Sequence, residues 1–285
     1  MDEINTGTLI VAAAPIGCAG DASPRLTAAL AQAAVIAAED TRRVRRLAAD
    51  LGVRLTAPVV SCYEAVEERR AGRLVADLQA GRDVLLVTDA GMPGISDPGY
   101  RLVTAAAEAG IRVTALPGPS AVTAALAVAG LPSDRFCFEG FPPRRAGDRA
   151  RRFAELAAER RTLVFFESRR RLAVTLTQLA GAFGPQRRAT VCRELTKTHE
   201  EIRRGTLGSL AEWAAVGVLG EVTIVIAGAA EERPERVDPG LAALDVAQRQ
   251  AEGMSRKDAI AAASAKFGLP KRAVYDAVVG KRPPE

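Results

Sequence analysis

The chain has 285 residues, 48% of them apolar and 26% charged, so it is long enough for about two packed domains. No apolar run is long enough to span a bilayer and no signal-peptide pattern opens the chain, which predicts a cytoplasmic protein. Four scattered cysteines without a CxxC spacing predict free thiols, not a disulfide framework or a zinc site, and the formal charge of +5 is only a mild bias toward polyanions.

Short apolar runs alternate with helical segments through the first half of the chain. The runs typical of strands occupy residues 9–13, 35–38, 59–62, 84–87 and 111–116. Helix starts are predicted where a capping side chain opens a helix, at Ser23-Pro24, at Asp40 or Thr41, and at Asp97-Pro98. This alternation predicts an α/β fold with a mainly parallel sheet and helices on both faces.

A turn at residues 117–120 and a small-residue helix over 121–129 mark a change of organisation. Further strands are predicted at 136–139, 162–166, 189–192, 201–204 and 222–227, with helices over 149–159 and 169–181, the second capped by Ser168. The longer spacing predicts a mixed sheet. Residues 231–236 read as a charged linker, and two short helices follow from about residue 241, with Ser255 as cap, Gly268 as stop and Pro270 as the next start. The expected domains are 1–117, 118–230, and a linker with a basic helical extension over 231–285.

The loop from Asp89 to Gly99 is the most informative stretch of the sequence. An apolar strand ends there in Asp, Gly and Pro residues, so main chain and two carboxylates are displayed at its carboxyl end, where open α/β sheets bind ligands. Residues 12–21, after the first strand, contain neither GxGxxG nor GxxxxGK[ST]. A phosphate cradle is therefore disfavoured, and an uncharged or cationic ligand is expected.

Several polar motifs at strand ends have a structural and a functional interpretation. Glu39-Asp40-Thr41-Arg42 is either a helix cap or part of a site, because it shares the carboxyl edge with Asp89 and Asp97. The single histidine, His199, excludes a site built from several histidines and is expected to be exposed without a catalytic role. The recurrent arginine pairs are either solvated faces or phosphate contacts. The C-terminal helices resemble a helix-turn-helix in outline, or form a small packing cap.

Six segments, in order, resemble the tetrapyrrole-methylase-like S-adenosylmethionine methyltransferases. They are Glu39-Asp40-Thr41-Arg42, residues 89–99, residues 116–121, Phe138-Glu139-Gly140-Phe141, Phe166-Glu167-Ser168 and residues 193–197. The resemblance runs from about Thr8 to Gly228, and within the family it is to the branch that methylates small-subunit ribosomal RNA. One departure is the run Arg169-Arg170-Arg171, where that branch commonly has Pro-His after the serine.

The resemblance implies two α/β domains with the cofactor in the cleft between them, a small C-terminal helical segment, and a homodimer. It implies 2′-O-methylation of the ribose of cytidine 1402 in the 16S rRNA of the small ribosomal subunit, with S-adenosylmethionine as methyl donor and no metal or membrane partner. The cofactor contacts that it carries over are Pro15, Asp89, Ala90, Gly91, Ile95, Ser120, Ala121, Phe166 and Leu195.

The chemistry of this reaction agrees with the residues present. A cationic sulfonium suits carbonyl edges and carboxylates, and a base assists a weakly acidic ribose hydroxyl. The candidates for catalysis are Glu39, Asp40, Arg42, Glu167 and Lys197, and the candidates for RNA contacts are Arg42, Arg43, Arg144, Arg145 and Arg193. Glu39 and Arg42 are expected on the RNA side of the cleft. Two alternatives stay open: a tetrapyrrole methyltransferase of the same fold, and a non-catalytic rRNA-binding assembly protein.

Overall fold

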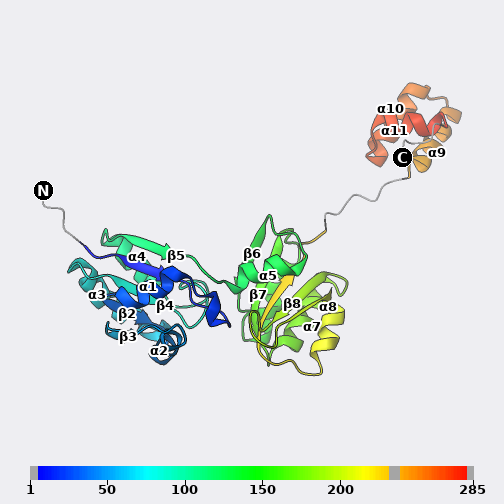
Figure 1. The fold of residues 1–285 in the computed structure, drawn as a ribbon. Helices are drawn as coiled ribbons and strands as arrows, with labels where there is room; N and C mark the ends of the chain where they lie inside the picture. The colour runs from blue at the N-terminus through cyan, green and yellow to red at the C-terminus, as the bar shows by residue number, and fades with distance from the viewer. Residues whose placement is uncertain (1–5, 231–237, 281–285) are drawn as a thin grey trace, which may run out of the picture. The chain divides into compact units, whose positions relative to one another are not determined.

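The chain divides into two compact units, Met1–Ala229 and Ala230–Glu285, in a computed structural model that describes residues 6–230 and 238–280 (Figure 1). The predicted charged linker at 231–236 lies outside the described residues. The larger unit contains two five-stranded sheets. None of the described helices is long and apolar enough to cross a membrane.

The first sheet is parallel throughout, as predicted, in the order β3-β2-β4-β1-β5. Its strands are β1 (Leu9–Ala12), β2 (Val35–Ala38), β3 (Val59–Ser61), β4 (Val84–Val87) and β5 (Val113–Leu116). Its helices are η1 (Ala19–Asp21), α1 (Pro24–Gln32), α2 (Thr41–Asp50), α3 (Glu64–Gln79) and α4 (Tyr100–Glu108).

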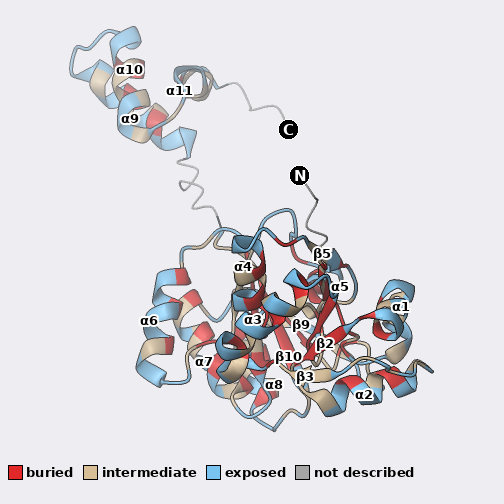
Figure 2. Ribbon diagram, turned by 90° about the vertical axis from the view of Figure 1, so that its left-hand side faces the viewer, coloured by how far each residue is buried: buried red, intermediate tan, exposed pale blue. Residues whose placement is uncertain are grey.

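Alternate strand residues face opposite sides of this sheet, and each side has its own apolar core. Val84 and Leu86 of β4 pack with α3 and α4, whereas Leu85 and Val87 pack with α1 and α2. Helices therefore cover both faces, which explains why all four β4 residues are buried. Figure 2 shows the buried residues along the strands and on the inner sides of the helices.

The second sheet is mixed, as predicted, in the order β6-β7-β10-β8-β9. Only β6 and β7 run parallel, and the other neighbours are antiparallel. Its strands are β6 (Phe136–Gly140), β7 (Thr162–Ser168), β8 (Arg188–Arg193), β9 (Glu201–Thr206) and β10 (Glu221–Ile226). Its helices are α5 (Ala121–Ala129), α6 (Ala146–Leu156), α7 (Leu172–Phe183) and α8 (Leu207–Ala214), the last of which the sequence did not suggest. Helix α5 packs on one face, and α6, α7 and α8 pack on the other.

Asp97 does not cap a helix, so that prediction is wrong. Helix α4 begins three residues later, at Tyr100, after Gly99 with a φ of 140°. The buried carboxylate of Glu67, on α3, accepts hydrogen bonds from the backbone N–H groups of Gly99 (3.0 Å) and Leu102 (3.1 Å). A side chain that is remote in sequence thus satisfies the first turn of α4 and leaves Asp97 outside it.

The predicted cap at Ser168 is also wrong. Helix α7 begins at Leu172, because residues 168–171 form a turn closed by a hydrogen bond from Arg171 N–H to the Ser168 carbonyl (3.0 Å). By contrast, Asp40 caps α2 as predicted, since its side chain accepts a hydrogen bond from Arg42 N–H.

The smaller unit has three described helices where two were predicted: α9 (Pro239–Ala251), α10 (Arg256–Phe267) and α11 (Lys271–Val278). The α10 boundaries are confirmed, with Ser255 as N-cap and Gly268 as a left-handed C-cap. The missed helix, α9, contributes Ala242 and Val246 to a small core that the other two helices complete.

Candidate active site

The loops that follow β1 and β4 are joined at the carboxyl edge of the first sheet. Ala14 N–H donates to the Gly91 carbonyl (2.8 Å), and Gly91 N–H donates to the Ala14 carbonyl (3.0 Å). Gly91 has a φ of 71°, which favours glycine at this position. The β4 loop is therefore held by main chain, and its amides and carbonyls keep a fixed direction.

A close approach at Gly17 joins this edge to the second sheet. A Cβ on Gly17 would lie 2.5 Å from Lys197 Cγ and 2.9 Å from the Leu195 carbonyl oxygen, so only glycine fits. Beside it, Cys18 N–H donates to Thr196 Oγ1 at 3.2 Å. The β1 loop and the β8–β9 loop thus form one continuous wall.

A cavity of about 570 Å³ opens against this wall, a size common for small-molecule sites. Both sheets contribute to it. The predicted cofactor contacts that line it are Ala90, Gly91, Ile95, Ser120, Ala121, Phe166 and Leu195. Pro15 and Asp89 do not line it, but their neighbours Ile16 and Ala90 do. Glu167 and Lys197 are at its wall, whereas Glu39 and Arg42 are not.

The beginning of β10 belongs to the cavity, which no motif in the sequence indicated. Gly220, Glu221, Val222 and Thr223 line it, because β10 runs antiparallel to both neighbours and starts where β7 and β8 end. The partner of Thr223 on β7 is Phe166. Met92, Ser96, Phe141 and Glu194 also line the cavity without having been predicted.

The acidic residues that follow β2 and β4 are joined by hydrogen bonds between their backbone N–H groups and carboxylates. Glu39 Oε2 accepts from Asp89 N–H (3.1 Å), and Asp89 Oδ1 accepts from Asp40 N–H (3.2 Å). Burial raises the pKa of Glu39 and of Asp89, while hydrogen bonds from Arg42 hold the pKa of Asp40 well below its usual range. Arg43 lies 3.4 Å from Asp89 Oδ2.

Asp97 is the carboxylate that faces this group from the β4 loop. It lines the cavity, and burial raises its pKa to about 7, with further contributions from the negative charges of Glu39, Asp89 and Glu221. A carboxyl group with such a pKa can exchange protons near neutral pH.

Glu167 is held by donors on every side. Its carboxylate accepts hydrogen bonds from Ser168 N–H (2.7 Å), from Thr175 Oγ1 (2.6 Å) and from Arg171 Nε and Nη2 (2.9 and 2.8 Å). The Glu167 side chain is 0% exposed. With its lone pairs occupied, this carboxylate fixes the end of β7 against α7.

Lys197 lies between two carboxylates. Its Nζ is 3.0 Å from Glu194 Oε1 and 2.8 Å from Glu221 Oε2. Burial opposes its charge, but the hydrogen bonds to Glu221 and Glu194 outweigh burial and raise its pKa. Lys197 therefore carries its proton at neutral pH and cannot accept another.

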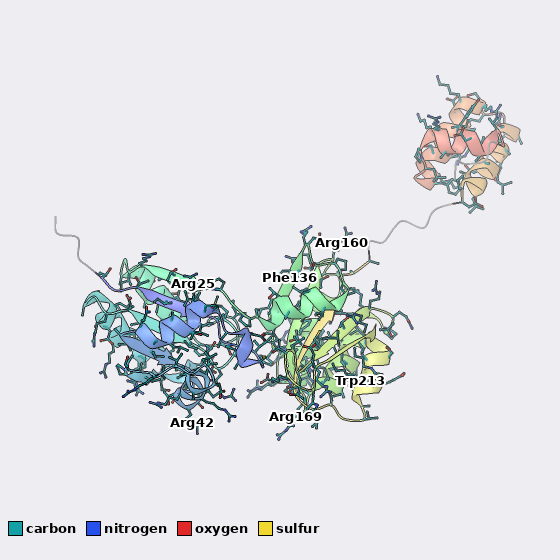
Figure 3. The ribbon with its side chains drawn as sticks, viewed as in Figure 1. Arg25, Arg42, Phe136, Arg160, Arg169 and Trp213 are labelled. Carbon is teal, nitrogen blue, oxygen red and sulfur yellow. The ribbon has the colours of Figure 1, made fainter. Side chains whose placement is uncertain are left out.

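The arginines predicted to contact RNA differ in how exposed their side chains are and in which groups they already bond. Arg42 and Arg43 are exposed at the start of α2, and Arg144 and Arg145 are exposed before α6. Arg193 instead bonds to Glu201 Oε2 (3.1 Å) and to the Leu219 carbonyl (3.3 Å). In Figure 3, Arg42 on α2 and the cavity-lining residue Arg169 in the turn after β7 both lie at the lower side of the unit.

The histidine and cysteines take no part in a cluster of ligating groups. His199 is exposed, and all four cysteines are free thiols. Burial raises the pKa of Cys192, at the cavity wall, to about 12. Within residues 6–230 and 238–280, no group of three or more His, Cys, Asp and Glu side chains is placed to hold a metal ion.

Comparison with known proteins places these features in context. Residues 8–211 match the family Tetrapyrrole (Corrin/Porphyrin) Methylases. The chain is 53% identical to "Ribosomal RNA small subunit methyltransferase I" of Mycobacterium tuberculosis, covering 98% of this chain and 97% of that protein. It is 42% identical to the protein of the same name from Pseudomonas aeruginosa, over 95% and 96% of the two chains.

Two solved structures share the fold of the larger unit. The methyltransferase CobJ is 24% identical and aligns with a TM-score of 0.59 over 80% of this chain and 97% of its own. Uroporphyrin-III C-methyltransferase from Thermus thermophilus, solved with S-adenosyl homocysteine, is 19% identical, with a TM-score of 0.53 over 77% and 96% of the chains.

Proposed function

The chain belongs to the tetrapyrrole methylase family, and we propose that it transfers a methyl group from S-adenosylmethionine to the 2′-hydroxyl of cytidine 1402 in 16S rRNA. The observation that carries this proposal is the cavity between the carboxyl edge of the first sheet and the beginning of β10, in a chain that matches ribosomal RNA small subunit methyltransferases I along nearly its whole length. The related structure that contains S-adenosyl homocysteine supports this cofactor.

The cavity suits S-adenosylmethionine in size and in charge. Ile16, Phe166 and Leu195 give it an apolar wall, and the Gly91 region offers main-chain donors and acceptors. Two cations line it: Lys197 is paired with carboxylates, and Arg169 is exposed at the rim. A sulfonium cation therefore meets carboxylates and carbonyl groups without an opposing free charge inside the cavity. When bound, this cofactor supplies an electrophilic methyl group.

The residues of this chain would position the two reactants. In-line methyl transfer depends mainly on alignment, and the fixed loop pair at Ala14 and Gly91 would provide it for the donor. Glu39 and Arg42 lie outside the cavity, next to the Asp89 carboxylate, which suits a place on the RNA side. Glu167 would act as a positioning residue, because its carboxylate is saturated with donors.

Exposed arginines would hold the RNA backbone. Arg144 and Arg145 offer exposed guanidinium groups to phosphates. Arg42 and Arg43 are also exposed, but Arg42 already pairs with Asp40 and Arg43 with Asp89, and Arg193 is occupied within the second sheet. Each phosphate contact makes the affinity more dependent on salt. Arg144→Ala/Arg145→Ala should therefore lower the slope of log affinity against log salt by about 2, and Arg25→Ala, an exposed change on α1 (Figure 3), should leave the slope unchanged. We also propose that the protein acts as a homodimer, to be measured by light scattering.

The decisive experiment uses labelled S-adenosylmethionine with small ribosomal subunits that lack the methyl group. Label in 16S rRNA that maps to cytidine 1402 and makes the adjacent bond resist alkali would support ribose methylation. Label in the base at that position would refute the 2′-O assignment. Label in a tetrapyrrole, but not in RNA, would favour the small-molecule alternative. Rejection of cofactor in calorimetry, together with salt-dependent binding of subunits, would favour a non-catalytic assembly protein.

A further inference from the structure

The wall of the cavity includes an exposed aromatic side chain. Phe141, the residue after β6, lines the cavity and is 57% exposed. The ring of Phe166 meets the Phe141 ring edge to face, with 5.6 Å between the centroids, and meets the Phe138 ring in the same way at 4.9 Å. Contacts of this kind favour one orientation of a ring. Phe141 therefore offers a fixed apolar surface to a molecule that enters the cavity.

Arg169 is exposed at the rim of the same cavity. It directly follows β7, and β6 and β7 run parallel, so their carboxyl ends lie at one edge of the second sheet. Lys197, the other cation of the cavity, is paired with Glu194 and Glu221. Within the part of the chain that the structure describes, Arg169 has no hydrogen bond or ion pair of this kind. Its guanidinium group is available to an anion.

A second arginine fastens the two segments to each other. Arg171 lies in the turn that carries Arg169, and its Nη2 donates to the Pro142 carbonyl (2.8 Å). Pro142 directly follows Phe141. The Arg171 guanidinium group is itself fixed by the buried Glu167 carboxylate, at 2.8 Å. The exposed ring and the exposed cation therefore stand on segments that are bonded together.

An aromatic ring and an unpaired guanidinium group are suited to the two parts of a nucleotide. Unpaired RNA bases stack on aromatic side chains, and arginine binds phosphate through two parallel hydrogen bonds. Asp97, Glu194 and Glu221 line the cavity and would repel a phosphate inside it. A nucleotide at this site would therefore keep its phosphate at the rim, beside Arg169, and its base against Phe141.

We propose that Phe141 and Arg169 form the subsite for the acceptor nucleotide. The base of that nucleotide stacks on the Phe141 ring, and Arg169 binds an adjacent backbone phosphate. This inference rests on the proposed function, because it needs an RNA acceptor. Every base has a face that can stack, so the subsite selects an unpaired nucleotide and does not by itself read cytosine. The two residues bind and position the nucleotide, and neither takes part in the transfer of the methyl group.

The first test measures the affinity for unmethylated small ribosomal subunits in the presence of S-adenosylhomocysteine, which cannot donate a methyl group. Phe141→Ala should weaken binding by about 5- to 150-fold, as expected for the loss of one stacked base. Phe141→Leu keeps apolar bulk without a ring and should also bind weakly, whereas Phe141→Tyr should bind like the wild type. These two variants keep the test valid if Phe141→Ala does not fold. Phe136→Ala is the control, because Phe136 is exposed at the other end of β6 (Figure 3) and does not line the cavity.

The second test compares Arg169→Ala with Arg170→Ala, the same change at the neighbouring exposed position, which does not line the cavity. Arg169→Ala should lower the slope of log affinity against log salt by about 1, because one phosphate contact is lost. Phe141→Ala should leave this slope unchanged, since stacking releases no counterions. Arg170→Ala should match the wild type. An equal loss of slope in both arginine variants would mean that the turn acts only through its general positive charge, and would overturn the subsite.

Two further measurements report on the stacked base. In steady-state methylation, Phe141→Ala should raise the KM for subunits and leave kcat nearly unchanged, because stacking holds the substrate and the transition state alike. Phe141→Trp should show tryptophan fluorescence that is quenched when subunits bind. The wild type, whose single tryptophan is Trp213 on α8, should change less. Equal quenching in the two proteins would contradict stacking at this position.

The outcomes separate this inference from the function on which it rests. Wild-type protein that labels no RNA would overturn the proposed function, and this inference with it. A wild type that labels RNA, beside Phe141→Ala and Arg169→Ala variants that bind subunits equally well, would overturn the inference alone. A loss of cofactor affinity in calorimetry for Phe141→Ala, with normal binding of subunits, would make Phe141 a wall of the cofactor site and would also overturn the inference.

Discussion

Removing the Glu167 carboxylate tests whether this residue acts in catalysis or in holding the fold. Glu167→Ala would leave the Arg171 guanidinium, which is 25% exposed, with the Pro142 carbonyl but without its carboxylate partner, and would leave Thr175 Oγ1 without this acceptor. Loss of one partner of a buried ion pair costs about 3–5 kcal/mol, and the partial exposure of Arg171 places the expected loss near about 3 kcal/mol. For a unit of this size that is a fall of about 6–12 °C in melting temperature.

The measurement is thermal unfolding followed by circular dichroism, with Arg171→Ala and the double variant completing a mutant cycle. Because the two side chains contact each other, the double variant should lose less stability than the sum of the single losses, by about 0.5–3 kcal/mol. The transfer rate of Glu167→Ala, measured well below its melting temperature, should keep the wild-type pH dependence. A variant that melts at the wild-type temperature but loses more than about 100-fold in rate would refute this reasoning and restore Glu167 as a base.

Three further changes probe other parts of the site. Glu67→Ala should destabilise α4 by about 1–2 kcal/mol and speed amide exchange at Gly99 and Leu102, with Glu67→Gln milder because its amide oxygen still accepts; unchanged exchange would contradict the capping role. Gly17→Ala should weaken cofactor binding in calorimetry, by up to about 3 kcal/mol, whereas Gly20→Ala, whose Cβ would meet only Cys18 Sγ at 3.4 Å, should not. Hydrogen bonds from the backbone N–H of Glu221 and from Lys197 lower the pKa of Glu194 below its ordinary 4.5, so its contribution to stability is present above pH 4.5 and lost as the pH falls through the lowered value. Glu194→Gln should flatten the dependence of melting temperature on pH in that acidic range, and an unchanged curve would count against the pairing.

The strands could be predicted because their signal is local. Apolar runs such as Val84–Val87 are buried on both faces, and no partner needs to be known to recognise them. Predictions of helix starts were wrong where contacts outside the local capping pattern determine the first turn. Asp97-Pro98 has the composition of a cap, but Glu67 satisfies the amides of α4 from another helix. Ser168 failed because the Glu167–Arg171 pair shapes the turn before α7.

The cavity likewise has one part that local sequence predicts and one part that it does not. Its first half follows from the rule that ligands bind at the carboxyl edge of a parallel sheet, which the Asp89–Gly99 loop obeys. The second half depends on the direction of β10, which enters the middle of its sheet antiparallel to β7 and β8. The apolar pattern of Val222–Ile226 does not indicate the direction in which the strand runs. The sequence therefore could not predict that Glu221 lies near Asp97.

The distribution of charge in the larger unit explains how it would bind a cationic methyl donor and a polyanionic acceptor at the same time. Inside the cavity, Lys197 is neutralised by two carboxylates and Asp97 is left over, so the interior favours a positive ligand. Outside it, Arg43 and Arg144 are exposed beside helix starts, where phosphates are also favoured by the helix dipole. A free cation inside would repel the sulfonium, and a free carboxylate among the outer arginines would repel the RNA. The pairing of Lys197 with Glu194 and Glu221, and of Asp40 with Arg42, removes both conflicts.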